Sequence, residues 1–275
     1  MSDPFQGKLC VVTGAASGIG RAVAIALARR GAALALSDVN EDGLAETRTL
    51  IGQVPSNRIR IDRLDVADAD AILRYAASVK ESLGDADYVF NIAGLTRVGR
   101  FEETPLSSFE KIMDVNFWGV VRMTKAFLPQ LMATKGGVVN ISSLFGFIGY
   151  PGQAHYCASK FAVRGFSETI ASELEEKGVR VTSVHPGGVD TAIARSAAID
   201  ALPPDVKDPR EIDERFRKAA ITSPERAAEI ILDGAARGKR RVVVGRDAKF
   251  VSFVQRLFPE TYAAKIKAFL PKPVT

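Results

Sequence analysis

Short apolar runs alternate with longer segments that carry apolar residues at helical spacing over residues 1–245. Most of the short runs are apolar at successive positions, which is typical of strands covered on both faces. The sequence therefore predicts strands at Lys8–Thr13, Ala33–Ser37, Arg58–Leu64, Tyr88–Asn91, Gly137–Ser142, Val179–Val184 and Arg241–Val244.

The segments between these strands are predicted to be helices, and two of them carry start signals. Asp68 stands where an N-cap is expected, and Ser223 precedes a proline at the first helical position. Repeated strand–helix–strand units indicate an α/β fold with a doubly wound parallel sheet of about seven strands and helices on both faces. The predicted helices are 18–30, 41–52, 68–83, 106–133, 153–177 and 224–237.

The absence of repeats and low-complexity linkers favours one domain, residues 1–248, followed by a tail, residues 249–275. Residues 190–221 interrupt the alternation with Pro203, Pro204 and Pro209. We expect this insertion to be a substrate lid, since long insertions in compact α/β domains are often lids; a plain surface excursion is the alternative.

The tail predicts a C-terminal extension of two short amphipathic helices that break at Pro259. Its apolar faces are expected to pack on the body or on a partner subunit. The alternative is contact with an anionic membrane surface, or with the entrance to a pocket for a lipophilic substrate. The apolar positions are Phe250, Val251, Phe253, Val254, Leu257, Phe258, Tyr262, Ile266, Phe269 and Leu270.

Charge is unevenly distributed along the 275 residues, which carry a formal net charge of +5. Residues 1–233 hold 27 basic and 30 acidic side chains, whereas residues 234–275 hold 10 and 2. The basic balance belongs to the tail, so we do not expect a nucleic-acid-binding surface.

The composition is that of an ordinary globular protein, with 47% hydrophobic and 25% charged residues. Two cysteines, Cys10 and Cys157, cannot form a disulfide framework, and a metal site is not expected. The sequence shows no apolar run long enough to span a membrane and no signal peptide at its start. We expect a cytoplasmic protein that could associate with a membrane through its tail.

A glycine-rich turn follows the first predicted strand and opens a helix. Gly14, Gly18 and Gly20 allow a tight turn and let backbone N–H groups approach a pyrophosphate. Asp38 ends the second strand, where a carboxylate accepts hydrogen bonds from ribose hydroxyls and repels a 2′-phosphate. The nearby Ser17 and Val39 are neutral, so the sequence favours NAD over NADP.

Three residues predict the acid–base chemistry. Tyr156 and Lys160 are four positions apart on one helix face, so the ammonium of Lys160 is expected to favour the phenolate and lower its pKa. Ser143 lies at the end of a strand, at the edge where parallel sheets bind ligands. Its hydroxyl could polarise a carbonyl or hold an alcohol oxygen.

These motifs, in this order, resemble the short-chain dehydrogenase/reductase family over roughly residues 5–245. The resemblance implies a Rossmann fold and NAD(P)-dependent oxidoreductase activity in a homodimer or homotetramer. It also implies that Tyr156 is the general acid–base and that Lys160 binds the nicotinamide ribose. The family usually has a second asparagine where Ile92 stands here. The matching residues are Thr13, Gly14, Gly18, Ile19, Gly20, Asp65, Asn91, Ala93, Gly94, Asn116, Ser143, Tyr156, Lys160, Pro186 and Gly187. Further residues expected to bind the cofactor are Ser17, Val66, Val189 and Thr191.

By the same resemblance, Asn116 supports a water in the proton relay, Asp65 and Val66 border the adenine, and Val189 and Thr191 contact the carboxamide side of the nicotinamide. Near the catalytic residues, Phe145, Phe147 and Tyr150 predict an apolar substrate site.

The leading hypothesis is an NAD-dependent enzyme that interconverts a hydrophobic secondary alcohol and its ketone. An NADPH-dependent 3-oxoacyl thioester reductase and a non-catalytic nucleotide-binding protein are the alternatives.

Overall fold

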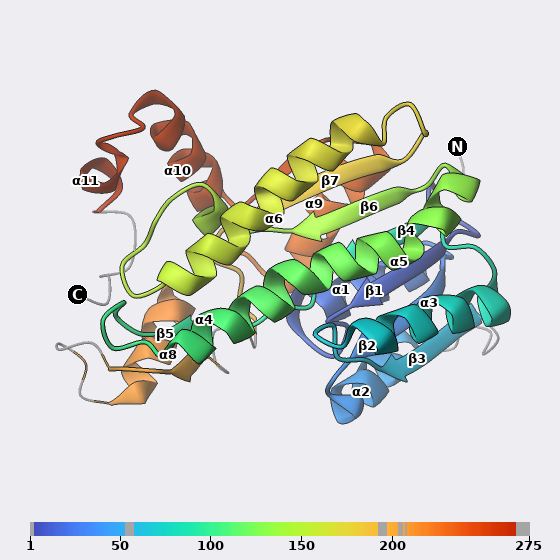
Figure 1. Ribbon diagram of the computed structural model, residues 1–275, viewed down its shortest axis with the longest axis horizontal. Coiled ribbons are helices and arrows are strands. Elements are labelled where there is room, and N and C mark those ends of the chain that lie inside the picture. The colour runs from blue at the N-terminus through green and yellow to red at the C-terminus, as the bar shows by residue number, and fades with distance from the viewer. Residues whose placement is uncertain (1–2, 53–57, 192–196, 203–205, 207, 268–275) are drawn as a thin grey trace.

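A seven-stranded parallel sheet forms the centre of the protein (Figure 1). The computed structural model describes residues 3–52, 58–191, 197–202, 206 and 208–267. The strand order is β3-β2-β1-β4-β6-β7-β9, so the connections reverse direction between β1 and β4. This confirms the predicted doubly wound sheet. Its strands are β1 (Leu9–Thr13), β2 (Ala33–Asp38), β3 (Ile59–Arg63), β4 (Tyr88–Asn91), β6 (Gly137–Ile141), β7 (Arg180–Pro186) and β9 (Arg241–Val244).

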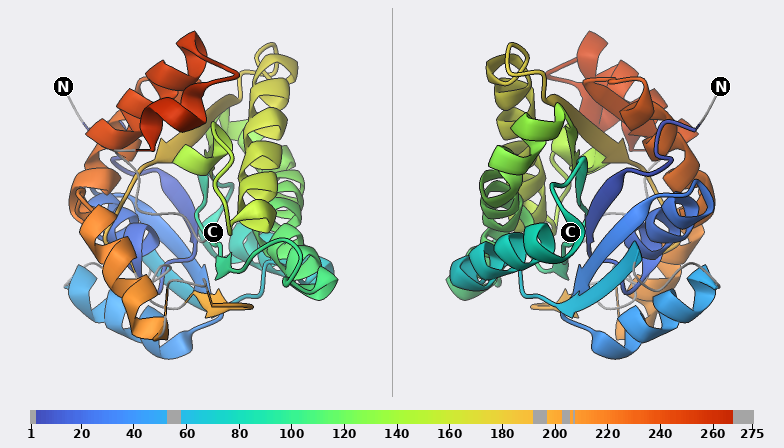
Figure 2. Two further views of the ribbon diagram at one scale, coloured as in Figure 1. Left: turned by 90° about the vertical axis from the view of Figure 1, so that its left-hand side faces the viewer. Right: turned by 90° about the vertical axis from the view of Figure 1, so that its right-hand side faces the viewer.

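Helices cover both faces of the sheet, as Figure 2 shows from two sides. On one face lie α1 (Gly18–Arg29), α2 (Glu41–Ile51) and α9 (Pro224–Ala236). On the other lie α3 (Ala69–Leu83), α5 (Gly119–Thr134) and α6 (Ala154–Glu173). The two apolar layers enclose the strands, which explains why the strand sequences are apolar on both faces.

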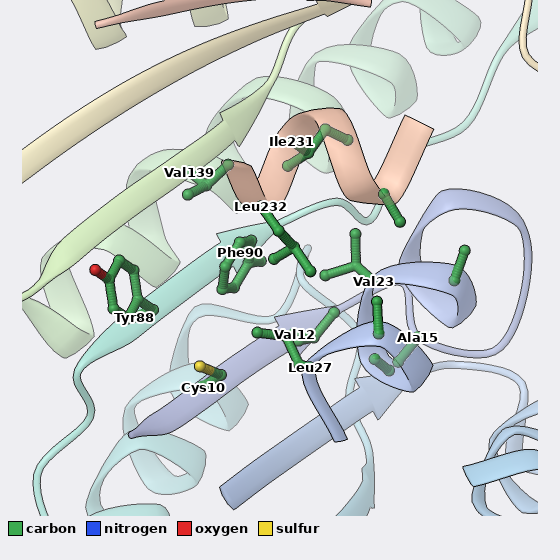
Figure 3. Close-up of a cluster of buried hydrophobic side chains, with 14 of the residues drawn as sticks. Cys10, Val12, Ala15, Val23, Leu27, Tyr88, Phe90, Val139, Ile231 and Leu232 are labelled. Atoms are coloured by element: carbon green, nitrogen blue, oxygen red, sulfur yellow. The ribbon is translucent and has the colours of Figure 1, made fainter. Parts of the chain in front are cut away.

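The layer beneath α1 and α9 is shown in Figure 3. Val12 and Phe90 project from the sheet toward Leu27 of α1 and Leu232 of α9, and all four side chains are fully buried. Burial of a side chain of this size contributes about 1.5–3 kcal/mol. This packing fixes the position of α1, whose first turn borders the site described below.

The predicted helix 106–133 is wrong in one respect, because the chain forms three segments there. A π-helical turn, Asp114–Trp118, separates α4 (Leu106–Met113) from α5. Such turns occur frequently at functional sites. A π-helical turn contains about one residue more than an α-helical turn, so it rotates the residues around Asn116 relative to the helix axis. The apolar pattern of the sequence continues through the turn and does not reveal this change.

The insertion 190–221 contains a helix that the sequence analysis missed, α8 (Pro209–Ala219). It also contains β8 (Ala198–Ile199), which pairs with β5 (Arg97–Val98). An ion pair joins the two strands: the Nε atom of Arg97 in β5 lies 3.0 Å from both carboxylate oxygens of Asp200, the residue after β8. Residues 192–196, 203–205 and 207 of the predicted lid lie outside the described residues.

The tail forms two helices, as predicted: α10 (Arg246–Leu257) and α11 (Tyr262–Ile266), on either side of Pro259. Figure 1 shows them at the end of the molecule opposite α2. Among the described residues, no helix is both long enough and apolar enough to cross a membrane. Phe269, Leu270 and Lys272 lie outside the described part of the chain.

Candidate active site

A cavity of about 630 Å³ opens at the carboxyl edge of the sheet, where β1, β4, β6 and β7 end. In an open α/β sheet, this edge is where ligands bind. Most of the residues predicted for the site line this one cavity. They are Gly14, Ser17, Gly18, Ile19, Gly20, Asp38, Asp65, Val66, Ala93, Gly94, Ser143, Phe145, Tyr150, Tyr156, Lys160, Pro186, Gly187, Val189 and Thr191.

The glycine-rich turn has no room for side chains. A Cβ atom at Gly20 would lie 1.9 Å from the carbonyl oxygen of Gly14, and one at Gly14 would lie 2.8 Å from the nitrogen of Ala93. Ser17 is the N-cap of α1, and the first turn of α1 contains no acidic residue. The N-terminus of α1 therefore presents backbone N–H groups and a partial positive charge to the cavity, as a dinucleotide pyrophosphate requires.

A threonine hydroxyl ties this turn to the end of β4. Thr13 Oγ1 accepts hydrogen bonds from the backbone nitrogens of Ile92 at 3.0 Å and Ala93 at 3.1 Å. The apolar side chain of Ile92 packs against the core beneath α1. With isoleucine at position 92, the end of β4 is therefore held by hydrogen bonds from its backbone N–H groups to the Thr13 hydroxyl.

The carboxylate of Asp38 lies at the end of β2 and lines the cavity. Its Oδ2 accepts a hydrogen bond from Ala16 N, and its Oδ1 accepts one from Asn40 N, each at 3.0 Å. A carboxylate has further lone pairs, so these bonds orient it without exhausting its capacity to accept from ribose hydroxyls. Arg21 is engaged elsewhere, donating to Glu46 Oε2 at 2.7 Å.

Ser143, Tyr156 and Lys160 surround the other end of the cavity. Ser143 follows β6, while Tyr156 and Lys160 share one face of α6. Lys160 Nζ donates to the carbonyl oxygen of Ile141 at 2.9 Å. Burial lowers the pKa of Lys160 to about 8, because the charged form loses its hydration.

The prediction that Lys160 lowers the pKa of Tyr156 is wrong for this structure. Burial raises the pKa of Tyr156 to about 12, and a hydrogen bond with Ser143 acts in the opposite direction without cancelling the effect. Desolvation of a phenolate outweighs a single hydrogen bond here. Tyr156 therefore carries its proton at neutral pH.

Two predicted asparagines lie outside the cavity wall. Asn91 was expected to contact cofactor, but its amide nitrogen donates to Asn140 Oδ1 at 2.8 Å and Thr124 Oγ1 at 3.2 Å, which joins β4 to β6 and α5. Asn116 is fully buried in the π-helical turn. Its amide accepts from Leu95 N at 2.8 Å and donates to Leu95 O at 2.9 Å, so it holds the segment after Gly94.

Phe147 was predicted to contact substrate, but it does not line the cavity. Its ring is 2% exposed and stacks on His185 with ring centres 4.1 Å apart. His185 in turn contacts the carbonyl oxygen of Ser143 through Nδ1 at 3.1 Å. Phe147 therefore supports the serine from behind, and apolar composition alone could not separate it from the lining residues.

The other two aromatic residues form one wall of the cavity. Phe145 stacks on Tyr150, with ring centres 4.8 Å apart and planes at 13°. The same ring lies edge-on to Tyr156 at 6.2 Å. The apolar lining around them continues with Leu95, Val115, Ile212 and Ile221.

Several lining residues were not predicted from the sequence. Lys111 of α4 and Arg215 and Lys218 of α8 bring positive charge to the substrate side. Asp247 of α10 reaches the turn after β7, where its Oδ2 accepts from Gly188 N at 2.7 Å. Asp208 and Pro209, an N-cap followed by a proline, were the available signal for α8.

A glycine-lined helix N-terminus and a half-buried tyrosine beside a buried lysine, all in a single cavity, define a class of protein: a dinucleotide-dependent oxidoreductase acting on CH–OH groups. Comparison with known proteins agrees. The family model for short chain dehydrogenases matches residues 8–202. The chain belongs to the short-chain dehydrogenase/reductase family, and the non-catalytic alternative is set aside.

Relatives extend the similarity over nearly the whole chain. A Mycobacterium tuberculosis protein named "Putative oxidoreductase SadH" is 46% identical, with 97% of this chain and 98% of the relative covered. Epidermal retinol dehydrogenase 2 of Mus musculus is 33% identical, with 92% of this chain and 79% of the relative covered.

Similar solved structures contain NAD or a hydroxylated NADP. A short-chain dehydrogenase/reductase from Burkholderia phymatum in complex with NAD has a TM-score of 0.83 at 26% identity, covering 94% of this chain and 95% of that one. An alcohol dehydrogenase from Thermococcus sibiricus complexed with 5-hydroxy-NADP has a TM-score of 0.73 at 31% identity, covering 87% and 95%.

Proposed function

We propose that this protein interconverts a hydrophobic secondary alcohol and the corresponding ketone, with Tyr156 as the general acid–base. One observation carries the proposal. The phenol of Tyr156, hydrogen-bonded to Ser143, faces the same cavity as the stacked rings of Phe145 and Tyr150. An apolar wall with few polar groups suits a substrate whose hydroxyl is its main polar feature.

NAD, when bound, supplies the acceptor or donor of the hydride at the carbinol carbon. Tyr156 moves the accompanying proton: the phenol donates its proton to the carbonyl oxygen in reduction, and the phenolate form takes the hydroxyl proton when the alcohol becomes a ketone. Ser143 holds the substrate oxygen by a hydrogen bond. Because the pKa of Tyr156 lies well above neutral pH, the phenol holds its proton and reduction begins with the donor in its required state.

Two further residues support the reacting groups. Lys160 is fixed by the Ile141 carbonyl, with its ammonium 5.6 Å from the centre of the Tyr156 ring, and would bind the nicotinamide ribose. Asn116 acts as a positioning residue, since its amide braces the backbone of Leu95 next to Gly94. Both sets of hydrogen bonds keep the cavity wall in a fixed position relative to Tyr156.

We also propose a preference for NAD over NADP. Asp38 would lie beside the 2′ position of the adenosine ribose, where a phosphate is repelled and a hydroxyl is bound. Val39, the adjacent residue, is neutral and 53% exposed. Arg21, the nearest cation on α1, is paired with Glu46.

A second candidate function, reduction of a 3-oxoacyl thioester, is favoured by a different observation. Lys111, Arg215 and Lys218 line the substrate side of the cavity. These cations would complement the phosphates of a thioester carrier. Asp38 argues against this candidate, because a reaction that uses NADPH would bring a 2′-phosphate beside its carboxylate.

An absorbance assay of the nicotinamide tests both candidates. Secondary alcohols and ketones of increasing apolar size are compared with a polyol and with acetoacetyl-coenzyme A, each with NAD(H) and NADP(H). The proposal expects kcat/KM to rise with apolar size and NAD(H) to be preferred. Activity confined to the polyol would refute the hydrophobic substrate, and a preference for the thioester with NADPH would establish the second candidate.

A further inference from the structure

Helix α10 has two apolar faces, and one of them remains on the surface. The inner face buries Ala248, Val251 and Val254 against a cluster that includes Leu144 and Ile148. The outer face carries large apolar side chains at helical spacing and continues past the end of the helix. These are Phe250, Phe253, Leu257 and Phe258, which are 39%, 62%, 54% and 42% exposed.

Positive charge surrounds this outer face. Lys265 of α11 places its ammonium 4.2 Å from the centre of the Phe258 ring. Asp247 turns inward to Gly188, and Glu260 is the exposed acidic residue in the described part of α10, α11 and their connection. The exposed cations there are Arg246, Lys249, Arg256, Lys265 and Lys267.

We propose that this face, formed by the four apolar side chains and the surrounding cations, docks on the surface of an anionic lipid bilayer. Aromatic residues and leucines flanked by lysine and arginine have the composition of interfacial helices, which bury their apolar face at the headgroup boundary. The cations add an attraction that depends on anionic lipid and weakens with salt.

The same charges disfavour a second copy of this chain as the occupant. In a twofold dimer the same patch lies on both sides of the interface, so the cations of both copies, Lys249 and Arg256 among them, would gather there with Glu260 as the exposed acid on each side. Like charges across an interface cost affinity. A negatively charged bilayer satisfies both the apolar and the cationic parts of the face.

The position of the patch gives docking a consequence for the cavity. The nitrogen of Gly149 donates to Tyr262 Oη at 3.0 Å, so α11 rests on the loop between Ser143 and Tyr150. That loop supplies the aromatic wall of the cavity. Docking therefore places the aromatic wall of the cavity beside the bilayer, where a lipophilic alcohol or ketone would concentrate. This consequence for substrate access rests on the proposed substrate class, whereas docking itself does not.

Vesicle co-sedimentation of the full chain tests the proposal. The probes are vesicles of phosphatidylcholine alone and of phosphatidylcholine mixed with phosphatidylglycerol, at low and high salt. The wild type is expected to sediment with the mixed vesicles at low salt. The variant Lys249→Glu/Arg256→Glu should bind mixed vesicles at least about 25-fold more weakly, since each basic residue contributes about fivefold to the affinity. Phe253→Ser/Leu257→Ser should also weaken binding.

Matched controls distinguish the face from general surface properties. Lys177→Glu/Lys239→Glu reverses two exposed cations elsewhere, and Leu50→Ser/Leu73→Ser removes two exposed leucines of α2 and α3, helices that lie away from α10 in Figure 1. Both controls should bind like the wild type. Circular dichroism verifies that each variant is folded.

Three results would overturn the proposal. They are the absence of vesicle binding, equal binding to neutral and mixed vesicles, and equal loss in the controls and the patch variants. A concentration-dependent dimer that Phe253→Ser/Leu257→Ser dissociates, without vesicle binding, would assign the face to a second copy instead.

Discussion

The ammonium of Lys160 lies 5.6 Å from the centre of the Tyr156 ring, and its hydrogen bond goes to the backbone of Ile141 rather than to the phenol. The i, i+4 spacing on α6 brings the two side chains together. Lys160 is thus held near Tyr156 while the phenol remains available to Ser143 and to a substrate oxygen.

Replacement of Tyr156 by phenylalanine should remove the proton donor and leave the cofactor contacts. We expect kcat to fall by about 10²–10⁴, the usual contribution of a general acid–base. NAD affinity, measured by calorimetry, should stay within about fivefold, because a lost neutral hydrogen bond contributes about 1 kcal/mol or less. Retention of more than about a tenth of the wild-type kcat would contradict the assignment.

Burial of Lys160 makes stability depend on pH in a defined window. The folded-state pKa is about 8, against 10.5 in the unfolded chain, so the unfolded state binds more protons between these values. Stability attributable to Lys160 should therefore increase as pH rises from 8 to 10.5. Relative to Lys160→Met, the wild type should gain about 3 kcal/mol in urea unfolding across this range. The exposed Lys177→Met should show no such gain, and parallel curves for wild type and Lys160→Met would refute the effect.

The main sheet could be predicted to within about two residues because its central strands β1, β4 and β6 are buried on both faces and read as apolar runs. The π-helical turn at 114–118 could not, since the apolar pattern passes through it unchanged. Helix α8 was missed because Pro209 was interpreted as part of a loop rather than as the first residue of a helix.

The positions of the glycine turn and Asp38 in the cavity could be predicted because both belong to one β-α-β unit, in which sequence neighbours are also neighbours in space. The substrate side could not. It combines α4, α8 and α10, and their approach depends on tertiary packing that no local spacing records. Phe145 and Phe147 are the sharpest case, because residues two apart with the same side chain lie on opposite sides of the loop.

The NAD preference should be reversible at two adjacent positions. Asp38→Ser/Val39→Arg removes a repulsive charge and adds an attractive one, so the ratio of kcat/KM for NADP to that for NAD should rise by about tenfold or more. Initial rates with each cofactor measure the ratio. Asp42→Ser, at an exposed acid of α2, is the control and should leave it unchanged. A wild type that already uses NADPH better than NADH would invalidate the argument.

Asp247 should influence cofactor binding from the C-terminal helix. Its carboxylate accepts from Gly188 N, and a Cβ atom at Gly187 would lie 2.1 Å from its Oδ2. Loss of a hydrogen bond to a charged group costs about 1.5–3 kcal/mol. We expect Asp247→Ala to raise the Kd for NAD about tenfold or more, and Asp247→Asn, which keeps an acceptor, to restore part of the affinity. An unchanged Kd in the alanine variant, with Glu260→Ala as the surface control, would remove Asp247 from the site.

The contrast between Phe145 and Phe147 separates substrate binding from folding. Phe145 lines the cavity, so Phe145→Ala should raise KM for a hydrophobic ketone while leaving most of the stability intact. Phe147 is buried against His185, so Phe147→Ala should lower the free energy of unfolding by about 3–5 kcal/mol, the usual cost of such a cavity. The milder Phe147→Leu keeps most of the side-chain volume and should leave KM near the wild-type value in a folded enzyme. Urea unfolding and initial-rate kinetics on the three variants decide the matter. A rise in KM for Phe147→Leu as large as that for Phe145→Ala would place Phe147 in the substrate site after all.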